Sequence, residues 1–321
     1  MLHRAYEGWK ELEDRTGEQV YFETGLLYHG PSDHPVIKGV KEAAELYRIE
    51  IKNISAERGA VDYPQFSFVN SNETLSEPGA GFLLPGKAIS LFVNEAIKKR
   101  AVIKTGEQVL EWKKDRDLIK VSTDKNTYYS RKLIITAGAW AGKIITQLKT
   151  ALKVTRQVVL WVKPGNANDF TPANFPCWLI ADHQRDGALY GFPYLPKEKY
   201  GKPGGLKIAW HFPGDETDPD AVNRQVKPAE TDRLILDIAK YIPAVRKSTI
   251  VAAKTCLYTN SEDENFIIDH LPGHDGDITI ACGFSGHGFK FVPVIGEVLA
   301  DLAMEGTTKY PVDFLSLERF H

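Results

Sequence analysis

A thiol and an ammonium group in the last third of the chain have the residue types and the setting for cofactor chemistry. Cys256 follows the strand-like stretch 249–253, which predicts a nucleophilic sulfur at the tip of a strand. Lys290 ends the run GFSGHGFK at 283–290, a glycine-rich turn between a predicted strand at 278–281 and a helix beginning near Phe289. Such a turn and the helix N-terminus behind it can hold an anionic ligand. The two runs therefore predict a cofactor site within reach of the thiol.

A second pair of polar side chains lies on the predicted strand 206–211. Lys207 and His211 are four residues apart, so strand alternation places both on one face, while Ile208 and Trp210 take the other. Taken alone, this pattern is the polar face of a half-exposed strand.

Each of these residues also has an ordinary structural interpretation. Cys256 alone would be a small buried apolar residue, and Lys290 a solvated lysine. Tyr190 and Tyr258 would be core residues. His287 has no carboxylate or second histidine at ligand spacing, so no metal site is expected.

Several motifs, taken together and in order, resemble the monomeric sarcosine oxidase and N-methyl-L-tryptophan oxidase family of flavoproteins. The resemblance extends over the whole chain. It is carried by the following segments: LIITAGAW at 133–140, YGFP at 190–193, Lys207 with His211, CLYT at 256–259, DENFIID at 263–269 and GFSGHGFK at 283–290.

The resemblance implies a role for each matched residue. Cys256 would carry FAD through a covalent thioether, and Lys290 would hold the substrate carboxylate. Lys207 would help dioxygen to accept an electron, and His211 would contact the substrate. The other implied residues are Tyr190 and Tyr258, which would line the substrate cavity, and Val109, Ala137, Gly138, Trp140, Gly286, His287, Gly288 and Phe289, which would contact FAD.

The implied reaction is the FAD-dependent oxidation of a secondary amino acid, either N-methylated or cyclic, to an imine. The imine would hydrolyse to an aldehyde and an amine, while dioxygen is reduced to hydrogen peroxide. The protein supplies position and charge, whereas the cofactor supplies the redox chemistry. The partners expected on this interpretation are a small amino acid and dioxygen.

One departure from the family concerns the ADP half of FAD. The family begins with a βαβ unit that carries G-x-G-x-x-G, and none of the 26 glycines of this chain forms that motif. Met1 instead falls in the helix that follows this unit in the family. We expect an N-terminally truncated form. The alternatives are a non-catalytic pseudoenzyme or amino-acid-binding protein that no longer holds FAD, and an enzyme whose nucleotide-binding unit comes from another chain.

The pattern of apolar residues predicts a mixed α/β (α+β) chain with two interleaved domains. Helices are expected at 36–46, 88–100, 140–148 and 229–241, and strands at 19–29, 101–104, 108–112, 118–122, 127–129, 133–136, 206–210 and 249–253, with a hairpin punctuated by Gly25 and Gly30. By resemblance, residues 1–18, 79–150 and 254–321 form a truncated Rossmann-like FAD-binding domain. Residues 19–78 and 151–253 form a mostly antiparallel-sheet substrate domain.

Composition excludes several classes of protein. A net charge of −2 over 321 residues gives no basic field to bind nucleic acid or a membrane surface. No stretch reaches the roughly 18 apolar residues of a membrane span, and no signal peptide is apparent. Three irregularly spaced cysteines form neither a disulfide framework nor a zinc site. We expect a cytoplasmic monomer.

Overall fold

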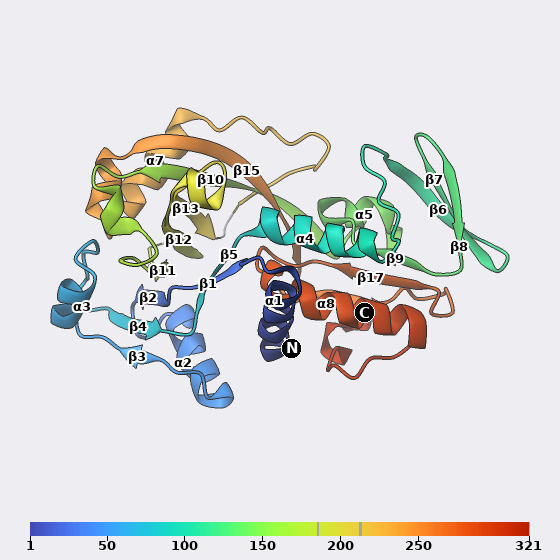
Figure 1. Cartoon of the computed structure of the whole chain (residues 1–321), viewed down its shortest axis with the longest axis horizontal. Coiled ribbons are helices and arrows are strands. Elements are labelled where there is room, and N and C mark those ends of the chain that lie inside the picture. Colours follow the sequence, from blue (N-terminus) through green and yellow to red (C-terminus); the bar gives the residue numbers. More distant parts are fainter. Residues whose placement is uncertain (185, 212–213, 321) are drawn as a thin grey trace.

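A nine-stranded sheet is the largest sheet of the computed structural model, which describes residues 1–184, 186–211 and 214–320 (Figure 1). Its neighbouring strands pair antiparallel, except for the parallel pair β2 and β11. The strands, in spatial order, are β14 (Asp215–Glu216), β10 (Leu152–Lys163), β13 (Gly205–His211), β12 (Ala188–Leu195), β11 (Cys177–Ala181), β2 (Leu26–Gly30), β4 (Glu73–Glu77) and β3 (Lys52–Asn53), with β15 (Thr249–Ser261) also paired with β10.

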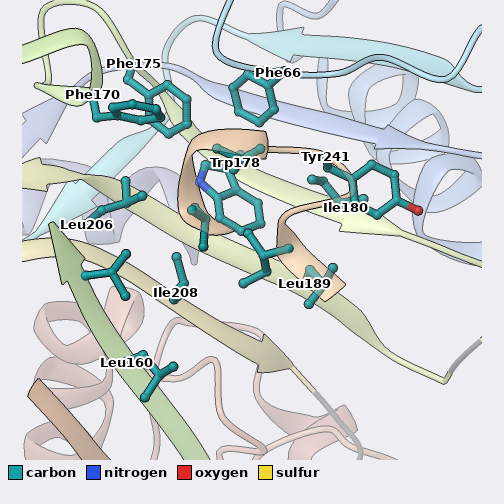
Figure 2. Close-up of a cluster of buried hydrophobic side chains, with 14 of the residues drawn as sticks. Phe66, Leu160, Phe170, Phe175, Trp178, Ile180, Leu189, Leu206, Ile208 and Tyr241 are labelled. Carbon is teal, nitrogen blue, oxygen red and sulfur yellow. The ribbon is translucent and has the colours of Figure 1, made fainter. Parts of the chain in front are cut away.

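One face of this sheet carries an apolar core. Leu206 and Ile208 of β13 point into it together with Trp178 of β11, and all three are fully or almost fully buried (Figure 2). Leu234 and Ile238 of α7 (Pro228–Ile238) cover the cluster. Because alternate residues of a strand face opposite sides, burial of these side chains directs Lys207 and His211 to the other face. The remaining helices beside this sheet are α2 (Pro35–Tyr47), α3 (Ala56–Asp62) and α6 (Lys197–Tyr200).

A three-stranded sheet lies beside the C-terminal helix (Figure 1). It contains β16 (Ile267–His270), β17 (Ile278–Cys282) and β9 (Leu133–Ile135), and β17 and β9 run parallel. The helix α8 (Val292–Glu305) covers one face, where its Val298 meets Ile268 and Ala281. The other face packs against residues of a separate antiparallel sheet, which contains β6 (Val109–Asp115), β7 (Leu118–Thr123) and β8 (Thr127–Ser130).

The N-terminal helix contacts two other helices, α4 (Pro85–Lys98) and α8, that are distant from it in the sequence. Trp9 and Leu12 of α1 (Leu2–Thr16) pack with Ala88 of α4 in a small buried cluster. Arg4 of α1 forms an ion pair with Glu297 of α8. Next to this cluster, β1 (Tyr21–Glu23) and β5 (Gly81–Leu83) form a two-stranded antiparallel sheet.

Four sequence predictions about these elements were wrong in detail. Residues 101–104 form no strand. Gly25 does not punctuate a hairpin, because β1 pairs with β5 while β2 joins the large sheet. The helix expected at 140–148 is divided into η1 (Gly138–Trp140), α5 (Ala141–Ile144) and η2 (Thr146–Leu148), since Ile145 is extended. The strand expected to end at residue 253 continues to Ser261, because β10 pairs with it throughout.

The other predicted elements are present with small shifts at their ends. The proposed division into two domains remains a prediction, and β15 runs across its boundary at residue 253. Within the described ranges, no helix is both long and apolar enough to cross a membrane.

Candidate active site

One cavity of about 1560 Å³ brings most of the predicted site residues together. It is bordered by β12, β13 and β15 of the large sheet, by α1, and by the segment that leads into α8. The predicted residues that line it are Tyr190, Lys207, His211, Tyr258, Gly286, His287, Phe289 and Lys290. Residues more than 90 positions apart in sequence therefore share one site.

Lys207 presents its ammonium group to a set of aromatic rings. Its Nζ lies 5.0 Å from the ring centre of Phe192, 5.8 Å from that of Tyr190 and 5.9 Å from that of Trp161. These distances suit cation–π attraction. Burial lowers the pKa of Lys207, because the charged form loses solvation there. The cavity thus holds a positive charge that water screens poorly.

His211 and Tyr258 form a polar pair on neighbouring parts of the cavity wall. The His211 Nδ1 and the Tyr258 hydroxyl oxygen are 3.3 Å apart. Burial, together with the positive charges of His287 and Lys290, lowers the pKa of His211 to about 4. Burial raises the pKa of Tyr258, so the phenol keeps its proton. At neutral pH the pair is therefore uncharged, and the phenol can donate to the imidazole.

The glycine-rich turn is packed closely against β15. Gly286 has φ +78°, and a Cβ there would lie 2.4 Å from the Tyr258 ring. A Cβ on Gly288 would lie 2.4 Å from the ring of Phe284. Directly before Gly286, the buried Ser285 donates its N–H to the Thr259 carbonyl at 3.0 Å. Only residues without a Cβ permit this approach, so the glycines couple the turn to the strand that carries Tyr258.

The main chain of Lys290 is held by the N-terminal helix. The Trp9 indole N–H donates to the Lys290 carbonyl at 2.9 Å, and the Trp9 ring stacks on Phe289 with centroids 5.7 Å apart. The Lys290 side chain is reached by solvent through the cavity, yet surrounding protein lowers its pKa by desolvation. The carboxylate of Glu77 opposes this shift. Lys290 thus places a second partly desolvated ammonium group in the cavity.

Cys256 lies in the middle of β15 rather than at the tip of a strand, opposite Gln157 of β10. Its side chain is exposed. It lies two residues before Tyr258 on the same strand, so both side chains emerge on the same face. Cys256 is not among the residues that line the cavity, whereas Tyr258, two positions along the same strand, lines it. Strand β10 lies between β15 and β13, the strand that carries Lys207.

His287 and Gly288 belong to the glycine-rich turn. The surroundings of the His287 imidazole do not indicate a metal site. The His287 Nε2 lies 3.3 Å from the Glu264 carbonyl oxygen, and burial lowers the pKa of His287. Throughout the described part of the chain, no three His, Cys, Asp or Glu side chains are grouped as metal ligands.

Six predicted FAD contacts are not among the residues that line this cavity: Cys256 and Gly288, described above, and Val109, Ala137, Gly138 and Trp140. Val109 is an exposed residue of β6, and Ala137 precedes η1. Gly138 has φ +53°, and the Trp140 indole donates to the Asp220 carboxylate at 2.6 Å. The segment η1 lies beside β15, the strand that carries Cys256. Val109, Ala137, Gly138 and Trp140 could contact only a part of the cofactor that extends beyond the cavity.

Sequence reasoning missed several residues of the site. Neither Trp9 nor Glu77 was predicted to belong to it. The Tyr28 hydroxyl donates to Glu77 at 2.8 Å, and both residues line the cavity. Phe22 and Phe82 also reach it. Their strands have only three residues each, too few for alternation to show which side chains share a face.

Comparison with known proteins places the chain among flavoenzymes. The model of the FAD dependent oxidoreductase family matches residues 1–302. Monomeric sarcosine oxidase of Streptomyces avermitilis is 32% identical over 320 residues, which cover 99% of this chain and 82% of the relative. N-methyl-L-tryptophan oxidase of Salmonella dublin is 28% identical and is covered to 83% of its length.

Solved structures show the same fold. NikD, an amino acid oxidase of nikkomycin biosynthesis, superposes in its open form with a TM-score of 0.83 at 23% identity, over 98% of this chain and 81% of NikD. L-proline dehydrogenase from P. horikoshii superposes with a TM-score of 0.81 at 21% identity, over 99% and 82% of the two chains. Fold, matched sequence and cavity agree, and the chain belongs to the family of FAD-dependent oxidoreductases.

Proposed function

We propose that the protein is an FAD-dependent oxidase of secondary amino acids, N-methylated or cyclic. The observation that carries this proposal is the meeting of two partly desolvated ammonium groups, Lys207 and Lys290, in one aromatic cavity, with the exposed thiol of Cys256 on the strand that carries the cavity residue Tyr258. The products would be an imine, hydrolysed to an aldehyde and an amine, and hydrogen peroxide from dioxygen. The named activities of the sarcosine and N-methyltryptophan oxidase relatives support this reaction class.

The residues of the cavity fit the ring portion of FAD. Cys256 would hold it covalently, since its thiol is exposed and emerges on the same face of β15 as the cavity residue Tyr258. Gly286 and Gly288 let main chain approach closely where a larger residue would collide with a ring. When bound, the flavin supplies the two-electron oxidation of the C–N bond and the subsequent reduction of dioxygen.

Lys290 would bind the substrate carboxylate. Its ammonium group lies in a partly desolvated setting, where attraction to an anion is stronger than in water. Trp9 fixes the main chain of Lys290, so the position of the carboxylate would be fixed too. When binding fixes the orientation of a reactant in this way, the activation free energy can fall by up to about 7–11 kcal/mol in well-aligned systems.

Lys207 would stabilise the negative charge that develops on dioxygen. The aromatic rings around its Nζ offer no hydrogen-bond acceptor of comparable strength to a carboxylate, and burial limits screening by water. The role is electrostatic and needs no proton transfer. His211 and Tyr258, neutral at pH 7, would contact the substrate without adding charge.

The decisive experiment uses the FAD-loaded protein with a panel of N-methyl amino acids, L-pipecolate and L-proline. Each substrate is mixed without oxygen while flavin absorbance near the visible maximum is followed, and peroxide and aldehyde are then measured in air. Bleaching with equimolar peroxide and aldehyde for an N-methyl substrate supports the proposal. Bound amino acid without bleaching would instead identify a non-catalytic binding protein.

The proposal extends to assembly and location. The name of the monomeric sarcosine oxidase relatives supports a monomer, and three cysteines lacking a disulfide pattern support a reducing compartment, so we infer a monomer that works in the cytoplasm. Size-exclusion chromatography with light scattering would test the monomer directly.

A further inference from the structure

A continuous series of aromatic rings leads along the cavity away from the polar pair. The ring centre of His211 lies 6.1 Å from that of Tyr190, which lies 6.0 Å from Phe192. Phe192 in turn lies 6.5 Å from Phe82. All of these contacts are edge to face, the arrangement that aromatic pairs prefer. The series joins the proposed catalytic groups to a distant apolar wall.

Tyr200 closes the far end of this series. Its ring meets Phe22 at 5.2 Å and Phe82 at 6.2 Å, both edge to face. Phe22 and Phe82 are themselves stacked at 5.1 Å with an interplanar angle of 10°. We call Phe22, Phe82 and Tyr200 the distal wall, and all three line the cavity.

The distal wall is built from rigid backbone. Phe22 and Phe82 face each other across the antiparallel pair β1 and β5. The neighbouring Gly81 approaches so closely that a Cβ there would lie 2.0 Å from the Phe22 carbonyl oxygen. Tyr200 ends the short helix α6, which lies in the connection between β12 and β13. Lys207 belongs to β13.

Phe192 lies between Lys207 and the distal wall in this series of contacts. The Lys207 ammonium lies 5.0 Å from the Phe192 ring centre, and Phe192 in turn lies 6.5 Å from Phe82 of the wall. Sarcosine has no side chain, so a substrate of that kind has no apolar group that could pack against these rings.

The charges near the wall restrict what can lie against it. Lys199 and Lys202 line the same part of the cavity, so a cationic group would be repelled there. An apolar flat group would instead exchange water for ring contacts, which favours binding by burial and by aromatic packing.

We infer that the substrate carries an aromatic or similarly flat apolar side group, and that Tyr200 is a specificity-determining residue that contacts it. The inference rests on the proposed function, since it takes Lys290 as the anchor of the carboxylate. Binding and oxidation can nevertheless be measured separately, which keeps failures of the two proposals apart.

The test uses two carboxylates that the enzyme cannot oxidise as amines, indole-3-acetate and methoxyacetate. Calorimetric titration of the FAD-loaded protein should show that indole-3-acetate binds at least about tenfold more tightly, a difference of about 1.4 kcal/mol. The Tyr200→Ala variant should lose most of that preference, while its affinity for methoxyacetate stays within about twofold. The Tyr200→Phe variant, which keeps the ring, should retain the preference. Tyr47→Ala, at an exposed tyrosine of α2, is the matched control and should change neither affinity.

Equal affinities for the two ligands in the unmodified protein would overturn the inference, as would an unchanged preference in Tyr200→Ala. If neither ligand binds, the inference is overturned as well. If indole-3-acetate is preferred but no secondary amino acid bleaches the flavin, the wall is confirmed as a recognition surface and the proposed oxidase function fails. If sarcosine is oxidised more efficiently than N-methyltryptophan, the oxidase function stands and the inference about the side group fails.

Discussion

The indole N–H of Trp9 donates a hydrogen bond of 2.9 Å to the main-chain carbonyl of Lys290. Trp9 is almost fully buried in α1, whereas Lys290 follows the glycine-rich turn 281 residues later. The contact therefore ties the N-terminal helix to the group that we propose as the carboxylate anchor. It links stability and ligand binding in one interaction.

The Trp9→Phe variant should affect both stability and ligand binding. It leaves the part-buried carbonyl of Lys290 without its donor, which should lower the free energy of unfolding by about 1–3 kcal/mol and weaken carboxylate binding. Urea unfolding and calorimetry with a carboxylate ligand would measure both.

Trp112→Phe is the matched control. The Trp112 indole also donates to a main-chain carbonyl, that of Ile144, with a donor–acceptor distance of 3.0 Å, and this hydrogen bond lies away from the cavity. It should lose comparable stability with unchanged ligand affinity. Weakened binding in both variants would mean that Trp9 acts only through general stability.

Substitutions of the two cavity lysines should affect different half-reactions. Lys290→Met should raise KM for the amino acid at least about tenfold, because a charge-assisted contact worth about 1.5–3 kcal/mol is lost. Lys207→Met should slow reoxidation by dioxygen by about two orders of magnitude and leave anaerobic reduction nearly unchanged. Stopped-flow measurement of each half-reaction would show this. Equal slowing of both half-reactions in Lys207→Met would remove the role assigned to that ammonium.

Covalent attachment through Cys256 predicts a yellow colour that survives acid precipitation. The Cys256→Ser protein should release its flavin into the supernatant, since a hydroxyl forms no such thioether. Cys282→Ser serves as the control, because Cys282 is buried and its thiol pKa is raised to about 12 by desolvation. Release of flavin from the unmodified protein would show that the cofactor is not covalently bound.

Acid should destabilise the protein through a buried histidine remote from the cavity. His29 is 4% exposed, and its Nε2 accepts the N–H of Val69 at 3.3 Å while its Nδ1 lies 2.9 Å from the Thr74 hydroxyl. Burial lowers its pKa from 6.5 to about 4. Between pH 6.5 and pH 4, His29 therefore binds a proton in the unfolded chain but not in the folded protein. The free energy of unfolding falls as the pH drops through this interval.

The expected loss from His29 is about 3 kcal/mol over that interval. Urea unfolding at pH 7 and pH 5 should show most of this change in the unmodified protein. His29→Gln should be less stable at pH 7 and show a smaller difference between the two pH values. His3→Gln, at an exposed position of α1, should keep the full pH dependence. An undiminished pH dependence in His29→Gln would rule out this origin.

Periodic segments were predictable from sequence, and residues joined by tertiary contacts were not. The helix α4 and the strand β13 were predicted because apolar residues recur on one face, and alternation correctly placed Lys207 beside His211. Cys256 was misplaced at a strand tip, since its continuation to Ser261 depends on pairing with β10 and not on local pattern.

The distal wall shows the same limit more sharply. Phe22 and Phe82 lie about sixty positions apart in three-residue strands, and only the register of β1 with β5 brings their rings together. Tyr200 lies in the glycine- and proline-containing connection between β12 and β13, where four residues form the short helix α6. Nothing in the local sequence indicates that these rings share a surface.

The length of β15 has a consequence for alignment. Cys256 and Tyr258 lie on this one strand, and the buried Ser285 fastens the glycine-rich turn to Thr259 a single residue further on. Thermal displacement of the strand would carry the proposed flavin attachment point, the cavity tyrosine and the turn that leads to Lys290 together. The distance between the cofactor and a bound carboxylate would then vary less than the position of either group in the molecule. Turnover would therefore tolerate thermal motion of the surrounding sheet.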